Sequence, residues 1–186
     1  MEVIKTDIEG LVIIKPRIYT DARGYFFESF SQQEFDQKVQ PIKFVQDNQS
    51  MSARGVIRGL HFQIPPYAQS KLVRCVKGCI IDIALDIRQG SPTYGRHFAI
   101  ELSEDNNLQL FIPQGFAHGY AVLSNNAVFQ YKCDNYYHPE AEGGISPLDT
   151  ALAIDWHFDT DKAILSDKDL QHTDFSSFIS PFDINS

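Results

Sequence analysis

The sequence is poor in sulfur-containing residues and has no long apolar stretch. Its 186 residues include three cysteines and two methionines, and an odd number of cysteines cannot all pair within one chain. On one strand, Cys75 and Cys79 would lie ~13 Å apart, which is too far for a disulfide bond. No apolar run approaches the ~20 residues of a membrane span, and the first residues lack the order of a secretion signal. We therefore expect a soluble, cytoplasmic protein with buried thiols.

Positive charge is also scarce. The chain carries 16 lysines and arginines against 24 aspartates and glutamates, which gives a formal net charge of -8 at pH 7. Nucleic acids and anionic membrane surfaces need a basic face on their partner. The charge balance therefore predicts neither a nucleic-acid nor a membrane partner. It leaves room for a small anionic ligand where cations gather locally.

Apolar residues recur with a period of two along much of the chain. Over residues 81–87, Ile and Leu alternate with Asp and Ala, which is typical of a half-buried antiparallel strand. Similar short segments are separated by Gly, Pro, Asn or Ser, at residues 24–30, 43–50, 55–63, 71–76, 97–102, 108–113, 120–124 and 127–133. Helix is expected only over residues 31–40, which open with a capping box, and in the tail after Ser166. The pattern predicts a single all-β domain over residues 1–186, with a few short peripheral helices.

Two histidines stand in segments that resemble the two cupin motifs. The first segment, residues 55–78, contains His61, and the second, "PQGFAHGY", contains His118. Metal-binding cupins add a second histidine and a glutamate to the first motif, but those slots hold Gln63 and Lys71. A lysine ammonium would repel a metal dication, so we predict a cupin-type double-stranded β-helix, or jelly-roll barrel, without metal. A neutral imidazole beside an ammonium suits removal of a proton next to a carbonyl and stabilisation of the enolate.

The chain resembles the dTDP-4-dehydrorhamnose 3,5-epimerase family over nearly its whole length. The resemblance is carried, in the family's order, by the blocks "DARGYFFESF", "VQDNQS", "GVIRGLHFQ", "KLVRC", "DIALDIRQGSPTYG", "IPQGFAHGY", "YKCDNYYHPEAEGGI" and "SDKD". It implies epimerisation of dTDP-4-dehydro-6-deoxy-D-glucose at C3 and C5 to dTDP-4-dehydro-L-rhamnose, in dTDP-rhamnose biosynthesis. No cofactor is implied, because the C4 ketone already acidifies the protons at both carbons.

The resemblance also implies which residues act in catalysis. His61 would be the base, Asp169 its carboxylate partner, Tyr131 the acid on the opposite face of the sugar, and Lys71 the stabiliser of the enolate oxygen. Period two aims Tyr131 at the barrel interior. From the residues alone, His61 could instead be a packed core histidine, Tyr131 a packing residue and Lys71 a surface lysine. Asp167 is a rival for the place of Asp169.

Further positions match residues that contact the ligand in the family, namely Arg23, Phe26, Glu28, Gln46, Asp47, Asn48, Arg58, His118, Tyr137, Glu142 and Lys168. Tyr137 matches the aromatic that stacks on the thymine ring. The segment "RGYFFE" reaches into the neighbouring subunit's site in the family, so a two-fold homodimer is implied. Strict alternation would put Arg58 and His61 on opposite faces of their strand, and we therefore expect a bulge at Gly59.

Three other functions stay open at this point. A single-site epimerase or a ketoisomerase of a related dTDP-4-keto sugar would share most of these residues. A cupin dioxygenase would need iron or manganese, and a sugar-binding barrel without catalysis would need neither His61 nor Tyr131. The presence of Tyr131 together with His61 favours inversion of configuration, but does not decide whether C3, C5 or both are inverted.

Overall fold

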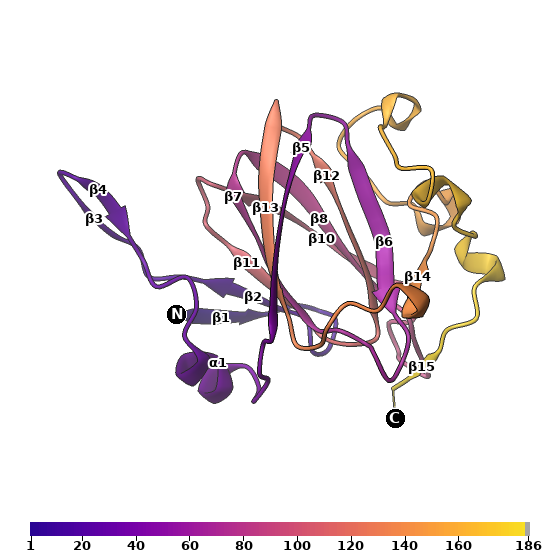
Figure 1. Ribbon diagram of the computed structural model, residues 1–186, viewed down its shortest axis with the longest axis horizontal. Helices are drawn as coiled ribbons and strands as arrows, with labels where there is room; N and C mark the ends of the chain where they lie inside the picture. The colour runs from indigo at the N-terminus through magenta and orange to yellow at the C-terminus, as the bar shows by residue number, and fades with distance from the viewer. Residues whose placement is uncertain (185–186) are drawn as a thin grey trace.

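The computed structural model describes residues 1–184, and its centre is formed by two antiparallel sheets packed face to face (Figure 1). The six-stranded sheet contains β1 (Glu2–Lys5), β2 (Val12–Lys15), β5 (Gln46–Ala53), β7 (Lys71–Lys77), β11 (Gln109–Ile112) and β13 (Asn126–Cys133). The five-stranded sheet contains β6 (Ile57–Gln63), β8 (Cys79–Asp86), β10 (His97–Ser103), β12 (Phe116–Val122) and β14 (Glu142–Gly144). Their spatial orders are β1-β2-β11-β7-β13-β5 and β10-β8-β12-β6-β14. The predicted all-β architecture is confirmed.

Apolar side chains from both sheets fill much of the space between them. Val73 of β7 and Phe129 of β13 meet Ala84 of β8 and Tyr120 of β12 in one buried cluster. The rings of Tyr120 and Phe129 stack with centroids 4.2 Å apart, so the two sheets are in direct contact. Because alternate strand residues point to the same face, residues two positions away from these four also point into the barrel.

The chain after β14 covers the outer face of the five-stranded sheet (Figure 1). Ile81 and Ile83 of β8 pack there against Leu152 and Trp156. The prediction of a half-buried strand at residues 81–87 is therefore wrong, since both faces of β8 are buried. The covering segment contains the short 3₁₀ helices η2 (Thr150–Leu152), η3 (Thr160–Lys162), η4 (Asp169–Gln171) and η5 (Phe175–Ser177), and it ends in β15 (Phe182–Asp183), which pairs with β9 (Arg88–Gln89). Another 3₁₀ helix, η1 (Pro139–Ala141), directly precedes β14.

The single α-helix of the described residues, α1 (Gln32–Lys38), packs on β2, β7 and β11 of the six-stranded sheet through Phe35. As predicted, it begins after an N-cap serine, because the Glu34 N–H donates to Ser31 Oγ at 3.3 Å. The Glu34 carboxylate instead accepts from the N-terminal amine of Met1 at 2.8 Å. The helix is anchored by Phe35, which packs edge-on against Phe111 of β11.

A hairpin of β3 (Tyr19–Asp21) and β4 (Gly24–Phe26) projects away from the barrel (Figure 1). The strand expected over residues 24–30 is therefore only three residues long here. The aromatic rings of the hairpin are open to solvent, with Tyr25 63% and Phe26 70% exposed. An isolated two-stranded hairpin has few neighbours to bury its side chains, so these rings remain uncovered within one chain.

The remaining expectations concern thiols and membrane spans. Cys75 and Cys133 are buried free thiols, whereas Cys79 is only partly buried. Burial raises the pKa of Cys75 to about 12 and that of Cys133 to about 11, so both stay protonated near neutral pH. Within residues 1–184, no helix has the length and apolar character that crossing a membrane would require.

Candidate active site

A cavity of about 270 Å³ lies between the two sheets. It is lined by Asn48, Gln49, Ser50, Arg58, His61, Lys71, His118, Tyr120, Phe129 and Tyr131. Lys71 and Tyr131 come from the six-stranded sheet, while Arg58, His61 and His118 come from the five-stranded sheet. The cavity therefore has two walls with different chemistry, and the predicted base and acid stand on opposite walls.

A bulge in β6 places Arg58 and His61 on the same wall. His118 of β12 pairs with His61, and Tyr120 pairs with Arg58, so two steps along β12 match three steps along β6. The extra residue lies at Gly59, which has a φ of +136° and sits so close to the backbone of β12 that a side chain would collide with it. The expected bulge is confirmed, and it explains how a strand of alternating faces can aim both side chains into one cavity.

His61 forms a pair with Asp169 from η4. The distance from His61 Nε2 to Asp169 Oδ1 is 2.5 Å, and the Asp169 side chain is only 4% exposed. Burial acts to raise the pKa of Asp169, but the hydrogen bonds from His61 and Ser166 outweigh it and hold that pKa below its ordinary value. Asp167 is exposed on the surface of the same turn. The structure thus pairs His61 with Asp169 and not with its rival.

This pairing fixes which nitrogen of His61 is free. With the neutral ring donating its Nε2–H to the Asp169 carboxylate, the lone pair of Nδ1 is left for another partner. The ring itself is 29% exposed, and it lines the cavity. A proton acceptor is therefore available at the cavity wall, backed by a buried negative charge that stabilises the protonated ring.

Tyr131 and Lys71 form the facing wall. They lie two residues from the core residues Phe129 and Val73, which explains why they point inward. Burial raises the pKa of Tyr131 to about 12, so its hydroxyl keeps its proton. The Lys71 ammonium lies 6.0 Å from the centre of the Tyr131 ring, and burial lowers the pKa of Lys71. A proton donor and a cation are thus placed side by side.

His118 belongs to a second buried histidine–carboxylate pair. Its Nε2 lies 3.0 Å from Asp82 Oδ2, and burial lowers the pKa of His118 although Asp82 opposes that shift. Sequence reasoning missed Asp82, because the alternation in β8 was interpreted as one solvent-facing row. The only signal for it was the charge of Asp82 within a run of apolar residues.

Four residues predicted to bind ligand form a separate cluster next to the His61–Asp169 pair. Glu142 Oε2 accepts from the Tyr137 hydroxyl at 2.5 Å and lies 2.6 Å from Lys168 Nζ. Gln46 Oε1 accepts the Tyr137 N–H at 3.1 Å. Glu142 belongs to β14, whose residue Gly144 pairs with His61. This pairing places the cluster along the same edge of the barrel as the His61–Asp169 pair.

Gln63, in the slot of a cupin metal ligand, binds backbone instead. Its side-chain N–H groups donate to the carbonyls of Tyr67 at 2.7 Å and Tyr136 at 3.1 Å, and its oxygen accepts the His138 N–H at 2.6 Å. Gln63 is buried, so all its polar atoms are engaged in joining two loops. These contacts fix the backbone on both sides of Tyr137.

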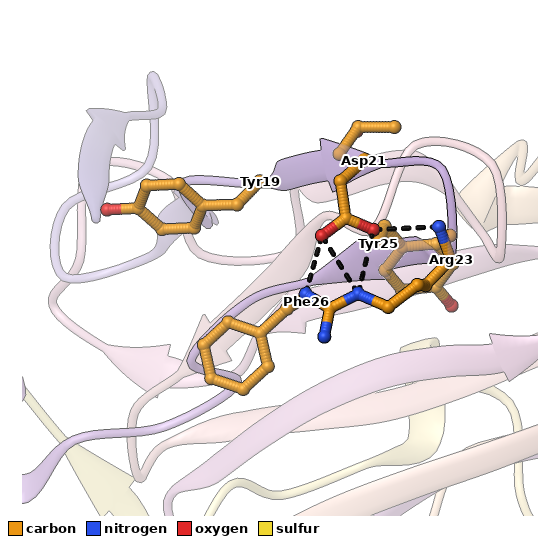
Figure 2. Close-up of a pocket in the computed structure, with 7 residues that line it drawn as sticks. Tyr19, Asp21, Arg23, Tyr25 and Phe26 are labelled. Atoms are coloured by element: carbon orange, nitrogen blue, oxygen red, sulfur yellow. Dashed lines mark hydrogen bonds and ion pairs between the residues drawn. The ribbon is translucent and has the colours of Figure 1, made fainter.

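Four predicted ligand residues are not brought to the cavity by their own chain. Asp47 accepts from Lys132 Nζ at 2.9 Å, on the face of β5 opposite Asn48. Arg23 forms an ion pair with Asp21 at 2.6 Å on the projecting hairpin (Figure 2). Arg23 and Phe26 both line a hollow of about 480 Å³ along the hairpin, and Glu28 is exposed two residues after β4.

The fold and this cavity define a cupin-type barrel whose site is equipped for proton transfer on two faces of a bound molecule. The family model for dTDP-4-dehydrorhamnose 3,5-epimerase matches residues 5–177. The chain belongs to this family.

Relatives share both sequence and fold over most of their length. The dTDP-4-dehydrorhamnose 3,5-epimerase of Escherichia coli K12 is 52% identical over 170 residues, which are 91% of each chain. The crystal structure of the Legionella pneumophila 3,5-epimerase in complex with dTDP-4-keto-L-rhamnose has a TM-score of 0.91 at 46% identity, covering 96% of this chain and 94% of that one. ChmJ, a 3'-monoepimerase from Streptomyces bikiniensis crystallised with dTDP-quinovose, is 31% identical with a TM-score of 0.88, covering 94% and 88%.

Proposed function

We propose that the protein epimerises dTDP-4-dehydro-6-deoxy-D-glucose at C3 and C5 to dTDP-4-dehydro-L-rhamnose, as a step of dTDP-rhamnose biosynthesis. The observation that carries this proposal is the placement of His61 and Tyr131 on opposite walls of one cavity. Inversion needs a proton to leave from one face of the sugar ring and another to arrive at the other face. A site with base and acid on one wall would return the proton to the face it left.

Each inversion follows from the positions of three side chains. His61 Nδ1 takes the proton from the carbon next to the C4 ketone, and the electron pair of the broken C–H bond moves onto the ketone oxygen as an enolate. The Lys71 ammonium stabilises that oxygen. Tyr131 then donates its proton to the carbon from the opposite face. His61 has gained one proton and Tyr131 has lost one, and both return to their starting state by exchange with solvent.

The remaining predicted residues hold the rest of the substrate. Tyr137 stacks on the thymine ring. Gln46 and Glu142 hold Tyr137 by hydrogen bonds, and Lys168 is ion-paired with Glu142. The residues that contact the sugar and the phosphates are Asn48, Arg58 and His118, which line the cavity. An arginine fork suits the oxygen pairs of a diphosphate, and Arg58 supplies it although the chain as a whole is acidic.

The working unit is a two-fold homodimer in which Arg23, Phe26 and Glu28 of one subunit complete the site of the other. The support is the projecting hairpin with its uncovered aromatic rings, together with Asp47, which lies outside its own chain's cavity. The three free thiols suit a reducing compartment, and we expect the enzyme to act in the cytoplasm.

A single-site epimerase is the second candidate, because the 3'-monoepimerase ChmJ has the same fold. The two functions are separated by incubating the 4-keto substrate with enzyme in deuterated water and following deuterium by NMR. Inversion at both carbons places deuterium at C3 and at C5, with product configuration read from ring coupling constants. Deuterium and inversion at one carbon alone would replace the proposed activity by that of a single-site enzyme.

The same experiment tests the two proton-transfer roles. Tyr131→Phe should still exchange substrate hydrogen for deuterium without inversion, because the enolate can be reprotonated by the base that formed it. His61→Ala should lose exchange at both carbons by ~10²–10⁴-fold, the range for a removed general base. If Tyr131→Phe inverts both centres at the wild-type rate, another group is the acid.

A further inference from the structure

His172 is a largely buried histidine beside the His61–Asp169 pair, with 12% of its side chain exposed, and the proposed reaction does not use it. Its Nε2 is buried and has no hydrogen-bond partner among residues 1–184. The same atom lies 3.8 Å from Asp169 Oδ1, and the ring packs edge-on against His61, with centroids 5.6 Å apart. Buried polar atoms are nearly always paired, so an unpaired imidazole nitrogen aimed at a carboxylate calls for a ligand.

The three side chains together offer the donor set of a metal site. One nitrogen of His61, one of His172 and one carboxylate oxygen of Asp169 all lie within 4.8 Å of one another. Two histidines and a carboxylate, with a fourth position left open, are a common ligand set for zinc. Tetrahedral zinc with bonds of about 2.0–2.2 Å holds its donors roughly 3.3 Å apart. Each of the three donors could reach such a position by a shift of about 1 Å.

We propose that a zinc-like divalent transition metal binds between His61 Nε2, Asp169 and His172 Nε2, and that it inhibits the enzyme. Coordination needs the lone pair of His61 Nε2, so the proton on that nitrogen moves to Nδ1. The ring stays neutral and no proton is released. The atom that accepts the substrate's proton is then already protonated, and the base is lost. Metal binding itself does not depend on the proposed function, whereas inhibition depends on His61 as the base.

The surrounding charges set the selectivity of this site. Lys168 is a cation whose charge lowers the pKa of His172, but it is ion-paired with Glu142 at 2.6 Å. The Asp169 carboxylate supplies the only negative ligand. Imidazole donors favour zinc, nickel and copper over magnesium and calcium, so magnesium should neither bind here nor inhibit. The would-be cupin metal slots at Gln63 and Lys71 offer one amide and one cation, so the enzyme should be fully active after exhaustive chelation.

The test starts from chelated wild-type protein and measures zinc affinity without substrate, by competition with a chromophoric chelator. We expect one zinc per chain, and a loss of activity over the same range of zinc concentration. His172→Gln should weaken zinc binding at least ~10-fold, since even supporting residues of a metal site cost that much. The control is His157→Asn, because His157 is an exposed histidine 3.9 Å from Asp155; its zinc affinity should match the wild type. Inhibition is compared with each variant's own zinc-free rate.

A second measurement does not depend on how well the variant folds. X-ray absorption at the zinc edge of the wild-type complex should show two imidazole nitrogens and carboxylate oxygen. One imidazole only, no stoichiometric zinc, or unchanged affinity in His172→Gln would overturn the site. Zinc that binds through His172 but leaves turnover unchanged would overturn the inhibitory role, and would at the same time contradict His61 as the base.

Discussion

At the scale of single residues, two aspartates of one turn have the same side chain but differ in burial and in hydrogen-bond partners. Asp169 is buried against His61, whereas Asp167 is exposed two positions earlier. A carboxylate at 2.5 Å from the imidazole fixes the tautomer and stabilises the ring once it has taken a proton. The same group at the surface would be screened by water. Burial and distance, not residue type, therefore decide which aspartate can support the base.

Asp169→Asn should lower kcat by roughly 10²–10⁴-fold, because a neutral amide neither fixes the tautomer nor stabilises the imidazolium. Binding of the nucleotide should be mostly retained, since the Tyr137 cluster is unchanged. The measurement is kcat by product NMR, with the Kd for dTDP measured by calorimetry. Asp167→Asn is the matched control and should behave like wild type. The reverse ranking of the two variants would show that the pairing seen in the structure is not the one used in catalysis.

Some of these residues could be predicted from sequence, and others could not. The inward rows of Lys71 and Tyr131 follow from period two, and the bulge at Gly59 follows from the need to bring Arg58 and His61 to one wall. Asp82 and His172 escaped prediction for one physical reason. Each is buried by a segment distant in sequence, so no local pattern distinguishes it from a solvated polar residue.

At the scale of elements, the same limit applied to whole strands. The alternation in β8 was real, but its polar row, with Asp82, faces the barrel interior, and the chain after β14 covers its apolar row, with Ile81 and Ile83. The N-cap of α1 was predictable because its hydrogen bond spans only three residues. A strand as short as β14 shows no alternation of polar and apolar residues that could be recognised in the sequence. Its place is set by pairing with β6, and the sequence alone does not specify that register.

The loop that carries Tyr137 is held by side-chain amides and not by regular secondary structure. Gln63 joins the backbone at Tyr136 and His138, and Gln46 accepts the N–H of Tyr137 itself. Ordering a loop before its ligand arrives lowers the entropy lost on binding. The structure therefore links a buried glutamine of β6 to the position of a ring that we propose to stack on thymine.

Gln63→Glu should raise KM about 30-fold with kcat nearly kept, because a carboxylate cannot donate to two carbonyls and each of the two lost hydrogen bonds costs about 1 kcal/mol. Steady-state kinetics and the Kd for dTDP would measure the effect. The matched control is Gln37→Glu, the same change on the exposed side of α1. A fall in kcat at unchanged KM would contradict a role through Tyr137, and melting temperatures would show whether the variant is merely unstable.

At the scale of the whole molecule, the cavity and the hairpin residues predicted to bind ligand lie in different parts of the structure. The cavity lies between the sheets, whereas Arg23 and Phe26 lie on a hairpin that extends away from them (Figure 1). The Arg23 guanidinium, with 90% of its side chain exposed, is ion-paired with Asp21 of the same hairpin. Exposed aromatic rings beside an exposed arginine are typical of surfaces that bind a partner. In a two-fold dimer, each hairpin would make the same contacts with the other subunit.

Mixing two inactive variants tests whether the hairpin acts across the dimer. One variant is His61→Ala, which lacks the base but has an intact hairpin. The other is the double variant Arg23→Ala, Phe26→Ala, which has the base but a disabled hairpin. In a mixed dimer, one site combines both defects, and the other has an intact base served by an intact hairpin. Subunit exchange should therefore restore activity to about a quarter of wild type, because half of the dimers are mixed and each has one working site.

Native mass spectrometry would verify that mixed dimers form. If they form and activity does not rise, the hairpin serves its own chain's site, and the shared-site arrangement is wrong.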